Sequence, residues 1–409
     1  MDELIRARIH DALVVEPPPP GLRSRVIEAV PMDHPRRRPW RMPAPRAQWA
    51  TGFAAVLLTA ALVAALVYSR IGSQVDQLHT PPAPGVHLIG PEGLAVAPDG
   101  TIYVSDYVGN RVYRMQQNGS LVTVAGGGSQ YEGVATKSNL FGPAGLAVAP
   151  DGDLYIADNL GTAIRKVDRF GMLSTFIAIH ATGGGNSPVG ITLDQDGSLY
   201  VANFGGDVVA IAPSLVTSKV DLSSVSAPRI NPSYLAFDSA GNLYVSDAGP
   251  TTKTPTNQVP QPPGGCRVIR IAPDGSVQVV AGTGSCGYSG DGGPAKQSEI
   301  NWPSGIAFDV AGNLYFADSN NHRIRRIDTR GIVTTVAGTG VEGHSGDGGR
   351  AVNAQLAYPA GLAMVQGRLL YVADGCGCMD PAAYGAVRVI DLSTGTITTA
   401  VSSRSRVVS

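Results

Sequence analysis

The sequence lacks an excess of charge of either sign. Its 31 Lys and Arg residues balance 32 Asp and Glu residues, so the formal net charge is −1, and charged residues make up only 15% of the chain. A nucleic-acid-binding domain carries a basic face that neutralises phosphates, whereas residues 88–402 show no basic excess that would cover one face of the domain. We therefore predict no nucleic-acid partner.

Cysteine is scarce, because there are only four and all lie beyond residue 260. Cys266 and Cys286 flank the hairpin-like stretch RVIRIAPDGSVQVVAG, so we predict a disulfide between them, which would contribute ~3 kcal/mol in an oxidising compartment. Two free thiols in loops are the alternative. Cys376 and Cys378 are too close in sequence to form a relaxed disulfide with each other, and no Cys and His cluster surrounds them to hold zinc.

The motifs of common catalytic sites are missing. The sequence contains no G-x-S-x-G elbow and no Cys/His pair at a recognisable spacing. Residues 88–402 contain three histidines, His180, His322 and His344, and none belongs to a zinc-ligand pattern. We predict no catalytic residue and no metal ligand, which favours a protein that is not an enzyme without deciding the matter.

One repeated pattern fills most of the chain. The stretch from Pro303 to Gly338, PSGIAFDVAGNLYFADSNNHRIRRIDTRGIVTTVAG, contains four short apolar runs with β propensity, separated by turn residues. Its core recurs, so that six units begin 44 to 71 residues apart, at Pro91, Pro143, Pro188, Pro232, Pro303 and Pro359. One such unit cannot bury both of its faces, but six stacked radially can. We predict an all-β, six-bladed β-propeller over residues 88–402.

The repeat resembles the NHL repeat. The consensus P-x-G-[IL]-A-x-D-x-x-G-[ND]-L-Y-[VIF]-[AS]-D-x-x-N-x-R-[IV]-x-x-[IV] is similar to that of the family, and Gly282–Ala295 (GTGSCGYSGDGGPA) resembles the linker of bacterial and teneurin-type NHL propellers. Blade six takes all four strands from the carboxyl end, so we expect no strand exchange between the termini, and residues 86–89 are a candidate extra edge strand. The resemblance implies a fold more firmly than a function, because this scaffold hosts both binding modules and enzymes.

A long uncharged stretch precedes the propeller. Residues 47–69 would form a helix of ~34 Å, enough to cross a hydrocarbon core of ~30 Å, so we predict a transmembrane helix there. Five arginines lie within the twenty residues before the stretch, namely Arg36, Arg37, Arg38, Arg41 and Arg46, and only Arg70 follows within twenty residues. This asymmetry predicts a cytoplasmic amino terminus and an extracytoplasmic propeller. A cleaved signal peptide is the alternative, but 46 preceding residues are too many and no A-x-A site follows. We predict a single-pass protein of the cell membrane with an uncleaved signal-anchor.

The remaining segments are short. Residues 1–46 contain two weak amphipathic patterns that predict short helices or disorder, and this region is a candidate for contact with a cytoplasmic partner. Residues 70–87 form a predicted Pro-rich linker, and residues 403–409 a carboxyl-terminal tail.

The long loops fall on one face of the predicted disc. Connections between strands two and three, and those that lead to the next blade, emerge on the same face, which we call the loop face; the opposite, tight-turn face is made of turns such as APDG, which leave little room for specific side chains. Long loop-face insertions occupy residues 248–265, 282–302, 338–358 and 375–385. We predict ligand-binding residues there, at Tyr288, Asp291, His344, Asp347, Tyr358 and Tyr384. Tyr288 and His344 precede two copies of S-G-D-G-G, a tight-turn sequence that contains the two aspartates.

A polar residue ends the second strand of every unit, at Asp106, Asp158, Asn203, Asp247, Asp318 and Asp374. A ring of carboxylates near the central opening would suit Ca²⁺. The alternative is that each side chain accepts backbone N–H groups in the turn that follows. Recurrence in every blade favours this architectural role.

Two functions stay open. The first is a membrane-anchored extracytoplasmic recognition or scaffold module, without a cofactor, that binds a protein or glycan ligand through the loop face. The second is implied by the resemblance to related lyase and gluconolactonase propellers: a metal-dependent lyase or lactonase with Ca²⁺ or Zn²⁺ in the central channel.

Overall fold

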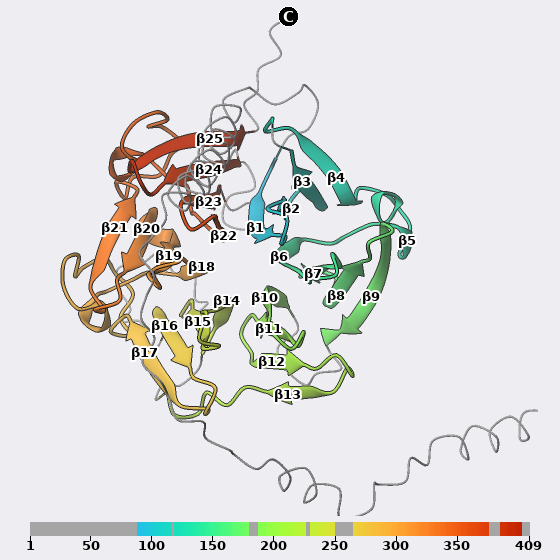
Figure 1. Ribbon diagram of the computed structural model, residues 1–409, viewed down its shortest axis with the longest axis horizontal. Helices are drawn as coiled ribbons and strands as arrows, with labels where there is room; N and C mark the ends of the chain where they lie inside the picture. The colour runs from blue at the N-terminus through green and yellow to red at the C-terminus, as the bar shows by residue number, and fades with distance from the viewer. Residues whose placement is uncertain are drawn as a thin grey trace, which may run out of the picture. The chain divides into compact units, whose positions relative to one another are not determined.

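Each repeat folds into a four-stranded antiparallel sheet, and the sheets follow one another around a central axis (Figure 1). The computed structural model describes residues 88–116, 118–179, 187–225, 230–249, 265–375 and 385–402, all within the second of two compact units, Val67–Ser409. Among these residues no helix is long and apolar enough to cross a membrane. The predicted transmembrane helix at residues 47–69, the regions 1–46 and 70–87, and the tail lie outside the described residues.

The strands of the first three blades are, in chain order, β1 (Pro91–Val96), β2 (Ile102–Asp106), β3 (Arg111–Met115), β4 (Leu121–Gly126), β5 (Gly133–Val134), β6 (Pro143–Val148), β7 (Leu154–Asp158), β8 (Ala163–Val167), β9 (Met172–Ala178), β10 (Pro188–Leu193), β11 (Leu199–Asn203), β12 (Val208–Ile211) and β13 (Thr217–Lys219). Blade two is β6–β9, and the short strand β5 extends it at the outer edge by pairing with β9.

The strands of blades four to six are β14 (Pro232–Phe237), β15 (Leu243–Asp247), β16 (Arg267–Ile271), β17 (Val277–Ala281), β18 (Pro303–Phe308), β19 (Leu314–Asp318), β20 (Arg323–Ile327), β21 (Val333–Ala337), β22 (Leu362–Val365), β23 (Leu369–Asp374), β24 (Ala386–Asp391) and β25 (Thr396–Ser402). Short 3₁₀ turns lie in connections between the described strands, among them η1 (Ala135–Lys137), η3 (Ala295–Gln297), η4 (Ser319–Asn321) and η5 (Ala351–Asn353). The predicted six-bladed, all-β architecture is confirmed.

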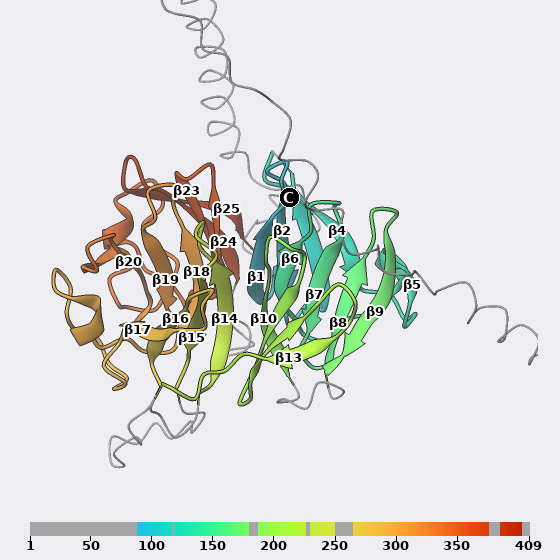
Figure 2. The same ribbon diagram turned by 60° about the horizontal axis from the view of Figure 1, so that its bottom comes forward.

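The first strand of each blade lies nearest the axis, and the fourth lies outermost (Figures 1 and 2). Alternation along the strands sends side chains to both faces of each sheet, so both faces need apolar cover. That cover is the next blade. In the core between blades one and two, for example, Val112 of β3 packs with Ile156 of β7 and Leu173 of β9. Six such cores are present, one at each junction between blades.

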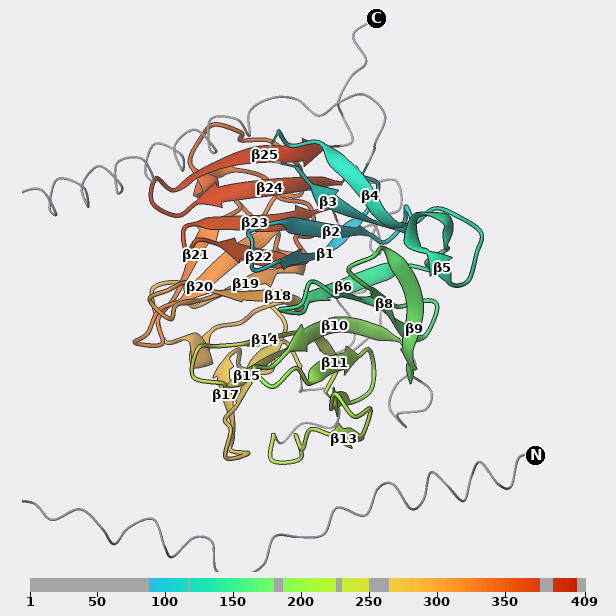
Figure 3. The ribbon, with the colours of Figure 1, turned by 45° about the vertical axis from the view of Figure 1, so that its right-hand side comes forward.

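The ring is closed by side-chain packing between blades six and one. Leu94 and Val104 of blade one share a core with Tyr371 and Val389 of blade six, and the two blades lie side by side in Figure 3. All four strands of blade six come from the carboxyl end, as expected. Leu88 is buried in the same core, but neither it nor Ile89 belongs to a strand, so the expected edge strand is absent from these two described residues. The backbone there turns aside because two of its N–H groups bind the Asp106 carboxylate.

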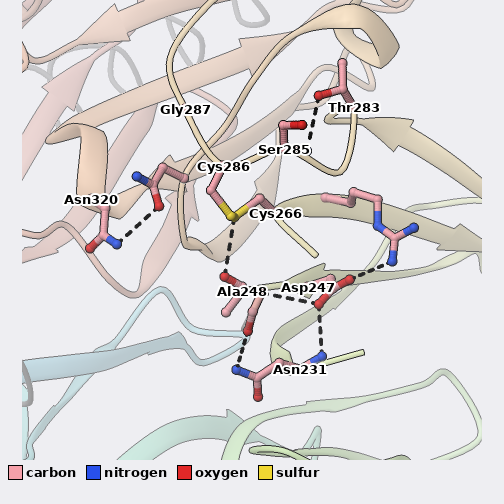
Figure 4. The surroundings of a disulfide bond; sticks show 12 residues. Asn231, Asp247, Ala248, Cys266, Thr283, Ser285, Cys286, Gly287 and Asn320 are labelled. Carbon is pink, nitrogen blue, oxygen red and sulfur yellow. Dashed lines mark hydrogen bonds and ion pairs between the residues drawn. A yellow bond between two sulfur atoms is a disulfide. The ribbon is translucent and has the colours of Figure 1, made fainter. Parts of the chain in front are cut away.

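A disulfide ties the entry of β16 to the loop that follows β17. Cys266 and Cys286 are joined, with their Cα atoms 5.3 Å apart (Figure 4). Cys266 is fully buried in the core between blades four and five. The neighbouring chain is fixed by Asp247, which accepts the backbone N–H of Asn231 at 2.9 Å. The bond therefore anchors the loop at residues 282–302 to the body of the disc.

Replacing Cys286 with Ala should lower the free energy of unfolding by about 3 kcal/mol, because the covalent link restricts the unfolded chain across a separation of 20 residues. Urea unfolding of the full chain measures the loss, and the neighbouring Ser285→Ala change should leave stability nearly unaltered. Mass mapping under non-reducing conditions provides the direct test. Recovery of both cysteines as free thiols would contradict the assignment.

Candidate functional site

The aspartates that end the second strands of five blades fix the start of those blades, whereas in blade three the buried Asn203 side chain has no hydrogen-bond partner among the described residues. Asp158, Asp318 and Asp374 accept the backbone N–H groups of Phe141, Asn301 and Ala357 at 2.6 to 2.7 Å, and Asp106 and Asp247 do the same in their blades. These donors stand 16 or 17 residues before the acceptor, in the segment that enters the blade. The expected contact with the following turn is also present in two blades, where the backbone N–H groups of Gly109 and Gly249 donate to Asp106 and Asp247.

Each of these aspartates is bound within its own blade. Burial raises the pKa values of Asp158 and Asp318 to about 6, although nearby N–H groups and an arginine oppose the shift. Among the described residues, no three His, Cys, Asp or Glu side chains form a group suited to a metal ion. The contacts seen for the aspartates are architectural.

Two buried arginines in the third strands clamp the S-G-D-G-G loops. The Arg325 guanidinium on β20 donates to Asp291 Oδ1 at 2.8 and 3.1 Å and to the backbone oxygens of Ser289 and Glu299. Arg388 on β24 repeats the arrangement with Asp347 Oδ1, at 2.8 Å. Both arginine side chains are completely buried. The aspartates predicted to bind ligand therefore hold their own loops in place.

Tyr288 lies over the first of these clamps. Its ring stacks on the guanidinium of Arg323, 3.7 Å from the ring centroid, and its hydroxyl donates to Asp291 Oδ2 at 3.0 Å. The residue remains 42% exposed. Tyr288 therefore presents a positioned aromatic surface on the loop face.

His344 occupies the equivalent place before the second loop but turns toward blade six. Its Nδ1 lies 3.0 Å from Asp374 Oδ2. Beside it, the ring of Tyr358 meets that of His322 edge to face at 4.6 Å, and the Tyr358 backbone N–H donates to His322 Nδ1. Burial lowers the pKa of His322, which keeps that nitrogen an acceptor.

The predicted ligand-binding residues thus form two groups rather than one. Tyr288 and Asp291 lie at the junction of blades four and five, whereas His344, Asp347 and Tyr358 lie at the entry of blade six. Tyr384 lies outside the described residues.

Further aromatic residues lie at the loop-face ends of the first and second strands, the two strands nearest the axis. Tyr107 and Phe204 directly follow β2 and β11, and Trp302 and Tyr358 shortly precede the first strands of blades five and six; we call these four half-buried residues the mouth aromatics. The Tyr107 hydroxyl lies 3.1 Å from Asn159 Oδ1 of blade two. The rings of Phe204 and Trp302 approach to 6.0 Å between blades three and five.

Sequence reasoning missed Tyr107, Phe204 and Trp302. The signal that would have found them is an aromatic directly after the Asp or Asn that ends a second strand, or directly before the Pro that opens a blade. These positions lie next to the axis only because the first and second strands are innermost.

A tyrosine crosses the channel below the mouth. In five blades the third residue of the repeat is Gly, and a Cβ added at Gly93, for example, would lie 2.2 Å from the Ala144 carbonyl oxygen of the next blade. Blade four instead has Tyr234, whose hydroxyl lies 3.0 Å from the backbone oxygen and 3.1 Å from Oε1 of Glu92 in blade one, on the opposite side of the ring (Figure 1). We call this pair the crossbar.

Burial raises the pKa of Glu92 to about 7, against an ordinary value of 4.5, and the Tyr234 hydrogen bond only partly opposes this. Between those two pH values the folded protein keeps a proton that the unfolded chain releases. The carboxyl group therefore stabilises the fold fully below about pH 4.5, and this contribution is lost as the pH rises to about 7.

Replacing Glu92 with Gln should stabilise the protein at pH 8 by about 3 kcal/mol and change little at pH 4, because glutamine accepts the same hydrogen bond and never ionises. Urea unfolding at pH 4, 6 and 8 measures the difference, with the exposed Glu342→Gln as control. A stability difference independent of pH would contradict the burial of an ionisable group at this position.

Replacing Arg325 with Met should cost roughly 3 kcal/mol of stability, because it removes one partner of a buried ion pair and leaves backbone oxygens without donors. Arg330→Met is the matched control, since Arg330 pairs with Asp328 while 80% exposed and such pairs contribute less than about 1 kcal/mol. Chemical denaturation compares the two. Equal losses would show that the clamp adds nothing beyond a surface ion pair.

Two family profiles match this chain. The profile described as the SMP-30/Gluconolactonase/LRE-like region matches residues 30–249, and the Teneurin NHL domain profile matches residues 184–343. Teneurin-3 of Danio rerio is 36% identical over 167 residues, which are 37% of this chain and 6% of that protein. Teneurin-4 of Mus musculus is 28% identical over 299 residues, covering 57% of this chain and 10% of that protein. The chain thus spans a tenth or less of these relatives.

Solved structures share the fold. A protein of unknown function from Bacteroides thetaiotaomicron superposes with a TM-score of 0.57 at 18% identity, over 75% of this chain and 70% of that one. The teneurin match confirms the resemblance to NHL repeats. Because the first profile covers more than half of its length, the chain belongs to the SMP-30/gluconolactonase/LRE-like family.

Proposed function

We propose that the propeller is a recognition module that binds a protein or glycan ligand through its loop face. The observation that carries this proposal is the set of mouth aromatics, four half-buried residues of blades one, three, five and six at the loop-face ends of the two innermost strands, of which Phe204 and Trp302 approach each other to 6.0 Å. Partly exposed Tyr and Trp side chains offer a large contact area together with a polar group, and they dominate binding energies at interfaces.

The surface around the mouth is held before any ligand arrives. In five blades a buried aspartate ties the start of the blade to its second strand. Arg325 and Arg388 clamp the two S-G-D-G-G loops, and the disulfide anchors the first of those loops. A fixed surface loses little conformational entropy on binding, which favours affinity. Within this proposal Tyr288, His344, Tyr358 and Tyr384 contact the ligand, whereas Asp291 and Asp347 position the loops.

The same proposal places the module outside the cell membrane. Its support is the uncharged stretch at residues 47–69 and the arginines that precede it. Residues 70–87 would then act as a short tether, and residues 1–46 would be available to a cytoplasmic partner. Reporter fusions after Ser409 test this part independently: an active cytoplasmic reporter, with inactive alkaline phosphatase, would refute it.

Replacing Trp302 or Tyr107 with Ala should weaken ligand capture by about 1 to 3 kcal/mol while the protein remains folded, because each change removes one positioned ring. The full chain is screened against a glycan array and by cross-linking on intact cells, and the variants are then compared on whichever ligand is found. Val310→Ala, in a tight turn on the opposite face and 91% exposed in the folded protein, is the control.

The proposal fails if the mouth variants bind like the wild type while the Val310 variant loses binding. Loss of binding in all three variants would indicate a general folding defect, which circular dichroism distinguishes. A ligand recovered only from the glycan array identifies a glycan, and one recovered only by cross-linking identifies a protein.

A metal-dependent lyase or lactonase is the second candidate, because the matching family description includes gluconolactonase. The described channel residues do not fit a metal site. The second residue of the repeat lies on the first strand, next to the channel, and in the six blades it is Glu92, Ala144, Val189, Ser233, Ser304 and Ala360. Glu92 is the one carboxylate among these six residues, and its Oε1 is bound by the Tyr234 hydroxyl. Calcium or zinc that stays at one equivalent after dialysis, together with lactone hydrolysis, would favour the enzyme over the recognition module.

A further inference from the structure

The central channel contains a chamber on the tight-turn side of the crossbar. Its volume is about 160 Å³, and one apolar residue from each blade lines it: Leu94, Leu146, Ile191, Leu235, Ile306 and Leu362. All six stand at the same place in the repeat, and each keeps between 5% and 8% of its surface exposed. The remaining lining residues are Gly145, Thr192, Tyr234 and Ala236.

Tyr234 forms the loop-face end of this chamber. Because its hydroxyl is held by two oxygens of Glu92, its ring is fixed across the axis. The lining residues are the third, fourth and fifth residues of the repeat, counted from its Pro. They lie on the first strand of each blade, which starts at the loop face and runs toward the tight-turn face. The chamber is therefore separate from the proposed recognition surface and faces the side that the tight turns surround.

The lining combines apolar side chains with backbone polar groups. None of the described residues that line the chamber carries a charged side chain. Each first strand is the edge strand of its own sheet, so one row of its N–H and C=O groups lies toward the axis without a partner strand in that sheet. A charged ligand would lose its hydration without an opposite charge to pair with. A neutral ring that carries a hydrogen-bonding group could instead pack against the apolar side chains and bind the backbone polar groups.

We infer that this chamber is a binding site for a small neutral cyclic molecule with a hydrogen-bonding group, of the size of phenol. The volume supports this size, since an engineered cavity of about 150 Å³ binds benzene. The site goes beyond the proposed loop-face function, because it lies on the other side of Tyr234 and uses none of the mouth aromatics. Molecules larger than one ring exceed the space.

Phenol, benzene and benzoate are added in turn to the full chain carrying labelled Leu and Ile methyl groups. Phenol should shift the methyl resonances of Leu146, Ile191 and Leu235 saturably and raise the unfolding temperature, since a ligand that binds only the folded state stabilises it. Benzene should bind more weakly, and benzoate should not bind. The absence of saturable shifts with phenol would overturn the inference.

Filling the chamber provides the second test. Ala236→Leu and the milder Thr192→Leu should each abolish the phenol-induced shifts and stabilisation, whereas Tyr288→Ala on the loop face should leave both unchanged. If Ala236→Leu fails to fold, Thr192→Leu carries the test. Phenol stabilisation that persists in the folded, filled variant would place binding elsewhere and refute the site. Because Tyr288→Ala tests the loop face alone, failure of the recognition proposal remains distinguishable.

Discussion

Every blade of this propeller depends on its neighbours to cover its two apolar faces. A single four-stranded sheet has no core of its own, and each of the six cores is built from side chains of two consecutive blades. The core between blades six and one is assembled in the same way, and within residues 88–402 no described strand is exchanged between these blades. The ring is therefore closed by apolar packing between blades six and one. This packing is possible only when the six blades have similar widths and twists.

Close packing between the first strands of neighbouring blades makes the spacing of the blades uniform. The recurring Gly lets a backbone carbonyl of the next blade approach to within a distance that a Cβ would block. Hydrogen bonds add to this contact at the closing junction, where the Gly361 N–H donates to the Glu92 backbone oxygen at 2.8 Å. The repeated polar residues also stabilise the architecture. The aspartates bind the segment that enters a blade to the end of its second strand, and the buried arginines bind the S-G-D-G-G loops to the third strands.

The departures from the repeat distinguish this protein from a regular propeller. Tyr234 replaces the recurring Gly and reaches across the axis to Glu92, and its side chain bounds one end of the chamber. The mouth aromatics occupy positions where other blades carry small or polar residues, such as Asn159 and Ala248. Because the repeated residues are engaged in architecture, these irregular positions are available for recognition.

The residues predicted for ligand binding also separate into candidates for ligand contact and residues that stabilise the architecture. Tyr288 keeps an exposed ring, and His344 and Tyr358 lie at the entry of blade six, so they remain candidates for contact. Asp291 and Asp347 instead neutralise buried guanidinium groups. An Arg in the middle of an apolar third strand, in the same blades that carry S-G-D-G-G, was the available signal for that pairing.

The sequence by itself determined the blades, because a strand, its tight turn and its partner strand lie within about 20 residues and are encoded by local alternation and turn residues. It also indicated that Cys266 and Cys286 approach each other, since both border one hairpin. Only the tertiary structure decided which residues meet across the ring. Tyr234 and Glu92 are 142 residues apart, and Phe204 and Trp302 belong to blades that are not neighbours. Such contacts depend on the radius and closure of the disc, which no local pattern specifies.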